Sequence, residues 1–375
     1  MEKRPAVSAP SMPNGGKRIP YIHISIIKEA VPMSVVYHES TQTFHLTNGL
    51  ISYIMKVLPN GALGQLYFGR AIRDRESFDH LLEMRRRPMT ACVFEDNGLF
   101  SLEHTRQEYP SYGSTDYRRP AVQILQPNGS RITDFVVLSH TVTPGKPALE
   151  GLPATYCEAD SEAETLTVRL RDELLGVSLD LHYTLFADRP ALARSARIVN
   201  EGTLDLHLTH AMSLCLDLPD SGYEFVHFSG AWARERWMKV RRLEQGTQSV
   251  ESARGHSSHN HNPFIMLRRP GTDEDQGEVI GLSLVYSGNF LAQAEVDTWD
   301  TTRVTLGINP FGFDWKLAPG EAFQTPEAVV VYSCRGMNAM SQAFHRLYRS
   351  RLARGQWRDR PRPILINNWE ATYFG

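Results

Sequence analysis

Two tryptophans beside charged side chains are the first residues in the sequence that could do chemistry. In the stretch SGAWARERWMKV, Trp232 and Trp237 flank Arg234, Glu235 and Arg236. An indole ring can stack on the apolar face of a sugar ring, while guanidinium and carboxylate groups can bind its hydroxyls. The same stretch is equally typical of a buried tryptophan beside surface ion pairs, so sugar binding and plain packing both stay open.

The last ten residues, INNWEATYFG, carry a second group of this kind. Asn368, Trp369 and Glu370 follow the apolar run ILI, which predicts polar side chains at the carboxyl end of a strand. Barrel enzymes place substrate contacts at such strand ends, although any strand can end in exposed polar residues. Glu370 alone cannot hydrolyse a glycoside, because that reaction normally needs two carboxylates astride the bond.

Three histidines lie close together in the stretch HSSHNHN. His256, His259 and His261 could bind a metal ion through their imidazoles. The stretch follows Gly255 and precedes Asn262-Pro263, which favours a polar loop, so we predict no metal site. We found no phosphate-binding loop, no nucleophile elbow and no H-E-x-x-H pair, and no cofactor is implied.

The composition excludes several classes of protein. The chain has 375 residues with 41% hydrophobic and 22% charged residues and a net charge of −2, so nothing indicates binding to nucleic acid or an anionic membrane. No apolar run approaches the ~20 residues of a membrane span. The cysteines are few and widely spaced, which predicts reduced thiols in a cytoplasmic protein.

The elements that position these residues are mainly strands. From Ser34 onward apolar and polar residues alternate, as in TLTVRL, GVSLDLHYTLF and TLDLHLTHAMSLCLDLP, and EAVVVYS is apolar enough to be buried on both faces. In the longest of these, His210 lies among leucines from Leu204 to Leu218. Turns such as Pro59-Asn60-Gly61 separate the strands, and no alternation of strands and helices is found. We therefore predict an all-β fold, a large antiparallel β-sandwich.

A different pattern closes the chain. GMNAMSQAFHRLYRSRLARG places Met337, Met340, Phe344, Leu347 and Tyr348 at helical spacing, and Gly355 follows as a stop. We interpret it as a linker helix packed on the sandwich rather than as a membrane or partner surface.

The predicted domains are therefore four in number. We expect a disordered leader or mis-called start at 1–32, a β-sandwich at 33–333 and a linker helix at 334–360. Residues 361–375 would form the first strand of a truncated barrel, with ILINNW as its apolar core.

Six stretches together resemble the bacterial α-galactosidases of glycoside hydrolase family 36. They are QEYPSYGSTDYRRPA (107–121), GLPATY (151–156), GAWARERW (230–237), YSGNFLAQAEVD (286–297), GINPFGFDWKLAPGEAFQTPE (307–327) and RPILINNWEATYF (362–374). The resemblance implies a β-sandwich (a supersandwich), a helical linker and a (β/α)8 barrel. It also implies a tetramer that cleaves terminal α-galactosides such as melibiose and raffinose with retention of configuration, and no cofactor.

The resemblance assigns roles to two residues. Trp232 matches a tryptophan that contributes to substrate binding, and Trp369 matches one that lines the galactose pocket. Glu370 receives no catalytic role. Glu83 lies near the place where the family uses an acidic residue that reaches a neighbouring subunit, but the local match is poor.

The catalytic aspartates of the family belong to later barrel strands, so no residue of this chain is expected to be catalytic. Where the family continues ATYFDF, this chain reads ATYFG and ends at Gly375, which we interpret as a frameshift, an early stop or a truncated gene model. We expect the chain to be inactive alone. The alternatives are a galactoside-binding or oligomerisation module, and an enzyme whose other half is a separate chain.

Overall fold

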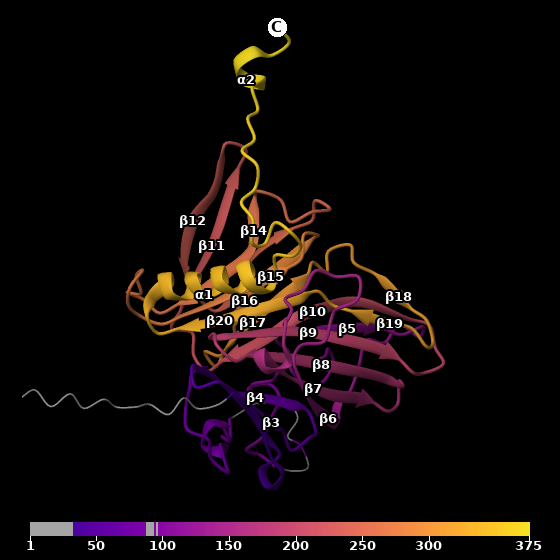
Figure 1. Ribbon diagram of the computed structural model, residues 1–375. Helices are drawn as coiled ribbons and strands as arrows, with labels where there is room; N and C mark the ends of the chain where they lie inside the picture. The colour runs from indigo at the N-terminus through magenta and orange to yellow at the C-terminus, as the bar shows by residue number, and fades with distance from the viewer. Residues whose placement is uncertain (1–32, 88–93, 95–96) are drawn as a thin grey trace, which may run out of the picture. The chain divides into compact units, whose positions relative to one another are not determined.

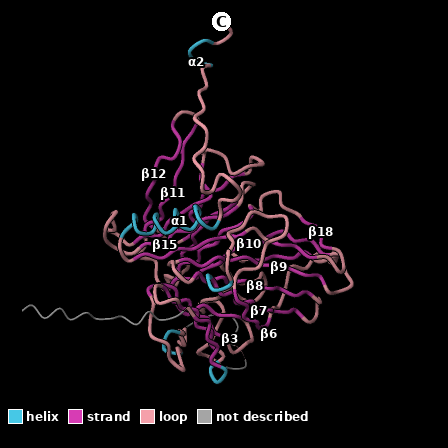
Figure 2. The backbone as a smooth tube through the Cα atoms, in the orientation of Figure 1, coloured by secondary structure: helices cyan, strands magenta, loops and turns pink. Residues whose placement is uncertain are grey.

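The computed structural model describes residues 33–87, 94 and 97–375, so the predicted leader at 1–32 lies outside the described residues. Within them, strands follow one another from Ser34 to Ser333, and the helix α1 comes after the last strand (Figure 1). Figure 2 shows the same dominance of strands along the backbone. The named strands pair antiparallel throughout, which confirms the predicted all-β fold of antiparallel sheets.

The largest sheet has ten strands and forms one layer of the sandwich. Its order is β12-β11-β14-β15-β20-β9-β8-β7-β6, and β19 also pairs with β9. The strands are β6 (Val136–Pro144), β7 (Ala163–Asp172), β8 (Val177–Phe186), β9 (Ala191–Asn200), β11 (Glu224–Ala231), β12 (Arg234–Arg242), β14 (His261–Arg268), β15 (Val279–Val285), β19 (Ala322–Gln324) and β20 (Glu327–Ser333).

A six-stranded sheet forms the opposite layer. Its order is β13-β16-β17-β10-β18, with β5 also paired to β10. The strands are β5 (Val122–Leu125), β10 (Leu206–Leu218), β13 (Gly246–Ser252), β16 (Phe290–Val296), β17 (Thr302–Ile308) and β18 (Trp315–Leu317). A third sheet, ordered β1-β2-β3-β4, packs onto the same core; it consists of β1 (Ser34–His38), β2 (Thr43–Thr47), β3 (Ile51–Val57) and β4 (Leu63–Arg70).

The core lies between these layers, and alternating residues supply it. Leu179, Leu181 and Tyr183 of β8 share one buried cluster with Leu208 and Leu216 of β10, because every second side chain of a strand points to the same face. The predicted inward faces of β7, β8 and β10 are confirmed. Leu204 is the exception, since it precedes β10 and is exposed.

Two groups of buried charges also cross the core. The Arg303 guanidinium lies 2.7 Å from carboxylate oxygens of both Asp217 and Asp116. In the second group, Arg194 lies 2.5 Å from Glu108. Burial would raise the pKa of Asp217, but the neighbouring Arg303 outweighs it and the pKa is lowered. Leaving a charge buried without its partner costs folding free energy, so within each group the charged residues depend on one another.

The predicted helix forms as α1 (Gly336–Arg351). Met337, Met340, Phe344 and Leu347 are buried against the outer face of the large sheet, where β20 supplies Val329 and Val331. Arg349 and Arg351 lie in the last turn, where cations suit the helix dipole. None of the helices in the described residues combines the length and the apolar character that crossing a bilayer requires.

The expected barrel strand over ILINNW is not formed, and this prediction was wrong for the chain as described. Residues 361–368 have no regular secondary structure, and a short helix, α2 (Trp369–Thr372), follows them. A strand needs a partner for its N–H and C=O groups. Among the described residues, no strand pairs with this segment, and its side chains are exposed.

Candidate functional site

The β11–β12 hairpin carries the predicted tryptophan site. Trp232 lies in the turn between the two strands and Trp237 lies in β12, opposite Ser229. Both indoles are exposed, Trp232 by 85% and Trp237 by 63%. The alternative of a buried tryptophan is therefore wrong, and both rings are available to a ligand.

The turn that holds Trp232 is tightly determined. Ala233 and Arg236 adopt left-handed φ angles of 62° and 60°, and the Glu235 carboxylate accepts a 2.9 Å hydrogen bond from the Ala233 N–H. A side chain at Gly230 would collide with the Arg234 carbonyl, so only glycine fits there. Among the described residues, Arg234 and Arg236 form no ion pair, which leaves both guanidiniums free for a ligand.

Two open hollows flank this hairpin. One, of about 380 Å³, is lined by Trp237 with Arg234, Lys239 and His261. The other, of about 600 Å³, is lined by Glu235 and Arg236 with His256 and His259. The smaller hollow offers an indole and cations, and the larger one offers a carboxylate and imidazoles. Such groups can contact the C–H groups and the hydroxyls of a sugar ring. Trp232 lines neither hollow.

The three histidines do not converge. His256 and His259 line the larger hollow, whereas His261 begins β14 and faces the smaller one. The ring of His261 packs 5.9 Å from the ring of His227. Burial and then the nearby Arg241 lower the pKa of His227 to about 4, so this imidazole is neutral at pH 7. In the described part of the chain, no group of three or more potential ligands is arranged to hold a metal.

The second predicted group is at the far end of the chain. Trp369 opens α2 and is 46% exposed; its ring meets Phe374 edge-on at 4.9 Å. The backbone N–H of Trp369 donates to the side-chain oxygen of Asn367 at 3.0 Å, and Glu370 is exposed. The hydrogen bonds of this segment are local, and the structure does not bring Trp369 into contact with Trp232.

Glu83 has a structural explanation of its own. Its carboxylate lies 2.5 Å from the guanidinium of Arg87, four residues later in the same irregular segment. Nothing in this geometry assigns Glu83 to a ligand.

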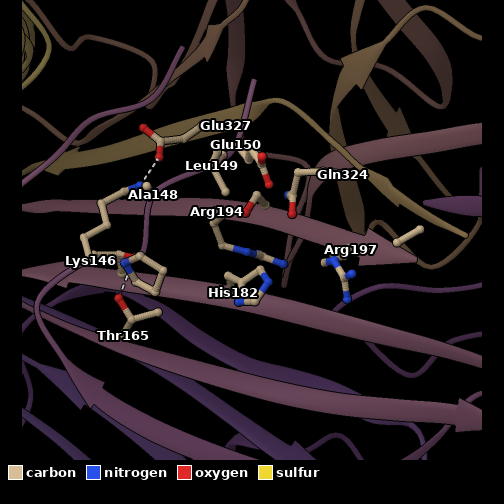
Figure 3. A pocket seen from close by; sticks show the side chains of 15 residues that line it. Lys146, Ala148, Leu149, Glu150, Thr165, His182, Arg194, Arg197, Gln324 and Glu327 are labelled. Carbon is tan, nitrogen blue, oxygen red and sulfur yellow. Dashed lines mark hydrogen bonds and ion pairs between the residues drawn. The ribbon is translucent and has the colours of Figure 1, made fainter. Parts of the chain in front are cut away.

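One polar cavity escaped the sequence analysis altogether. It lies on the outer face of the large sheet and is lined by Lys146, His182, Arg197, Gln324 and Glu327, among others (Figure 3). These residues come from segments far apart in the sequence. The one local signal is that His182 and Thr184 occupy the outward positions of β8, where a solvated face would look the same.

Comparison with known proteins identifies relatives of both the sandwich and the C-terminal part of the chain. Residues 61–318 match the family model of the glycosyl hydrolase family 36 N-terminal domain, and residues 322–375 match the melibiase model. An alpha-galactosidase of Lactobacillus acidophilus is 38% identical over 343 residues, which are 91% of this chain and 46% of that protein.

Solved structures agree with these matches. The crystal structure of the GH36 alpha-galactosidase AgaB from Geobacillus stearothermophilus superposes with a TM-score of 0.87 at 51% identity, over 91% of this chain and 47% of that one. A variant of AgaA from the same organism, solved in complex with raffinose, gives 0.86 at 51% identity over 88% and 46%. The chain spans about half the length of the relatives it matches.

Proposed function

Because the chain belongs to glycosyl hydrolase family 36, we propose that it is the N-terminal part of an α-galactosidase that hydrolyses terminal α-galactosides with retention of configuration. The observation that carries the proposal is the match of 61–318 to the family's N-terminal domain, with the melibiase match beginning directly after it. Melibiose and raffinose are the substrates we propose, and a relative has been crystallised with raffinose.

The mechanism assigns this chain a supporting role. Retaining hydrolysis uses two carboxylates about 5–5.5 Å apart, one as nucleophile and one as acid and base. We propose that the barrel supplies both, and that the 375-residue chain has no activity of its own. Trp232 and Trp369 then bind substrate through their indoles, the first from the β11–β12 hairpin and the second from the segment after α1. Their exposure supports this proposal.

The assay is hydrolysis of p-nitrophenyl α-galactoside by two proteins. The purified chain should show no turnover above buffer, whereas a chimaera that joins residues 33–374 to the remaining half of the Geobacillus relative should be active. Activity of the chain alone would contradict the assignment of the catalytic groups to the barrel. An inactive but folded chimaera would contradict the proposed function itself.

Each tryptophan is tested in the same chimaera. Trp232→Ala and Trp369→Ala should raise KM for melibiose more than tenfold, because a stacking contact with the sugar ring is lost. Trp315→Ala is the matched control, since Trp315 is half-exposed on β18, in the opposite sheet. A KM that stays unchanged in Trp232→Ala would remove that residue from the site.

A second function is favoured by the exposed hairpin. With Trp232, Trp237 and two open hollows on its surface, the chain by itself can be a galactoside-binding module. Titration calorimetry with melibiose and raffinose on the purified chain tests this. Binding that Trp232→Ala abolishes supports it, and an absence of heat at millimolar sugar rules it out.

The proposal includes assembly and location. We propose a cytoplasmic homo-oligomer, a tetramer in the full-length enzyme, with no nucleic-acid or membrane partner. The free thiols of Cys157, Cys215 and Cys334 suit a reducing compartment. Strand β12 is exposed along its whole length, including Trp237, Met238 and Val240, and such an edge suits contact with another chain. Light scattering of the chimaera measures the oligomer.

A further inference from the structure

The outer face of the large sheet is divided into two halves of different chemistry. Helix α1 covers the half formed by β15 and β20, where Val329 and Val331 point outward. Over β7, β8 and β9 the outward positions are polar instead, with Thr165, His182 and Ser195 among them. A polar sheet face can simply be exposed to water. Here, however, a segment of the chain crosses over the polar face.

That segment is residues 146–150, and buried bonds hold it in place. The Lys146 ammonium lies 2.6 Å from the Glu327 carboxylate, and both side chains are almost fully buried. The other carboxylate oxygen of Glu327 accepts hydrogen bonds from the N–H of Thr155 at 2.9 Å and from its hydroxyl at 2.6 Å. The chain is thus fixed to Glu327 of β20 at Lys146 and again at Thr155, and residues 146–150 between these points line a cavity of about 490 Å³.

Several polar side chains face this cavity, and each has at least one polar atom that no protein group among the described residues binds. Figure 3 shows His182 and Arg197 on the strand side, with Glu150 and Gln324 near the opposite rim. His182 uses one ring nitrogen to meet the Thr167 hydroxyl at 3.0 Å, and Gln324 donates its amide N–H groups to backbone carbonyls. In the described residues, the Arg197 guanidinium and the Glu150 carboxylate have no hydrogen bond or ion pair.

The balance of charge decides what kind of ligand fits. Lys146 and Glu327 neutralise each other, and Arg197 and Glu150 add one charge of each sign. Arg194 does not count, because its guanidinium points to the core and pairs with Glu108. The walls therefore carry no net charge, so an ion of either sign gains little.

The free groups suit hydroxyls in particular. Arg197 can only donate hydrogen bonds, Glu150 can only accept them, and the Gln324 carbonyl accepts as well. Burial lowers the pKa of His182, so its ring is neutral at pH 7 and can donate or accept. Pro147 and Leu149 offer apolar contact for C–H groups. The cavity volume lies within the ~300–1,000 Å³ of small-molecule sites.

We propose that this cavity is a second ligand site, which binds a neutral polyhydroxylated molecule of monosaccharide size. The site uses neither Trp232 nor Trp369 and does not rest on the α-galactosidase activity proposed above.

The test is titration calorimetry on the purified chain with D-galactose, D-glucose and sorbitol, and with inorganic phosphate as the charged probe. At least one polyol should bind with a Kd below about 10 mM, and phosphate should bind more weakly. Arg197→Ala and Glu150→Ala should each weaken that polyol about tenfold or more, because a hydrogen bond to a charged group is lost. Both residues are exposed and unpaired, so the variants should keep the melting temperature of the parent chain.

Trp232→Ala is the variant that separates this cavity from the hairpin, and it should bind the polyol as the parent does. Three results would overturn the proposal. They are the lack of binding by all three polyols, a polyol affinity that Arg197→Ala leaves unchanged, and phosphate binding tighter than any polyol.

Discussion

Strand β20 and the segment 364–369 are both predicted as strands from the sequence, and they have opposite structures. EAVVVYS is buried at every position and pairs with β15 on one side and β9 on the other. ILINNW is also apolar and rich in residues that favour strands, yet Ile364 is 95% exposed and the segment forms no strand. Apolar β-branched residues thus create a tendency, and a neighbouring strand turns it into structure.

The presence or absence of neighbouring strands also explains why the sandwich can bury charged side chains, whereas the C-terminal tail (residues 361–375) could not. Arg303 and Asp217 are fully buried and face each other, because β10 and β17 pair side by side within the six-stranded sheet. The tail has no such neighbours among the described residues, so its polar groups are met by water. Four predictions test this contrast between a buried, paired region and an exposed, unpaired one.

The largest difference in the free energy of unfolding is expected when a carboxylate is introduced into β20 and, for comparison, into the tail. Val330→Asp puts a carboxylate into the centre of β20 and should cost more than about 4 kcal/mol, enough to prevent stable folding. Ile366→Asp should change the free energy of unfolding by less than about 0.5 kcal/mol. Urea denaturation followed by circular dichroism measures both. A large loss in Ile366→Asp would mean that the tail packs against the sandwich after all.

The next effect concerns the buried ion pair. Asp217→Ala should destabilise the chain by about 3–5 kcal/mol, because it leaves Arg303 buried with one partner fewer. Asp205→Ala is the control, since it breaks an exposed pair with Lys316 and should cost at most about 1 kcal/mol. Equal losses in the two variants would show that burial does not set the value of these pairs.

The third predicted effect is that the stability of the sandwich depends on pH. Burial and then Arg119 lower the pKa of His210 to about 4, whereas an unfolded histidine has a pKa near 6.5. As the pH falls below about 6.5 the unfolded chain binds the proton first, so stability is lost between about pH 6.5 and 4, by at most about 3 kcal/mol for this residue.

His210→Gln should flatten the curve of stability against pH over this range. The measurement is the urea midpoint at several pH values for the variant and the parent chain. The segment 361–375 contains no histidine, so removing it should leave the curve unchanged. An identical slope in His210→Gln and the parent would show that this imidazole already titrates normally in the folded protein.

The smallest effect on stability is expected from deleting residues 360–375. The thermal midpoint should stay within about 1 °C, because these residues bury almost nothing. Solubility should improve, since exposed Ile364, Leu365 and Phe374 promote association. Turbidity at rising concentration measures this, and equal solubility of the two chains would contradict it.

Much of the fold could be predicted because it is local. Alternation identified the inward residues of β7, β8 and β10, helical spacing identified the face of α1, and Gly61 marked a turn that uses a positive φ angle. The tryptophan site was likewise visible, since Trp232 and Trp237 share one hairpin. Whether these tryptophans bind sugar remains a prediction.

The polar cavity and the buried charges could not be predicted in this way. The cavity joins a loop near 146, the middles of β8 and β9, and the start of β20, and no single stretch among these is distinctive. Arg303 and Asp217 are 86 residues apart and looked like ordinary charged residues of alternating strands. The irregular register of β10 beside His210 was equally hidden, because it depends on the pairing with β5.

The sequence by itself determined which segments tend to be strands, which face of each is apolar, and to which family the motifs point. The tertiary structure alone decided the order of the strands, the partners of the buried charges, the cavity over β7–β9, and the failure of 364–369 to become a strand. The physical reason is that the direction of a side chain follows from backbone geometry within a few residues. Pairing depends instead on groups that are distant along the chain, and their meeting leaves no periodic mark on the sequence.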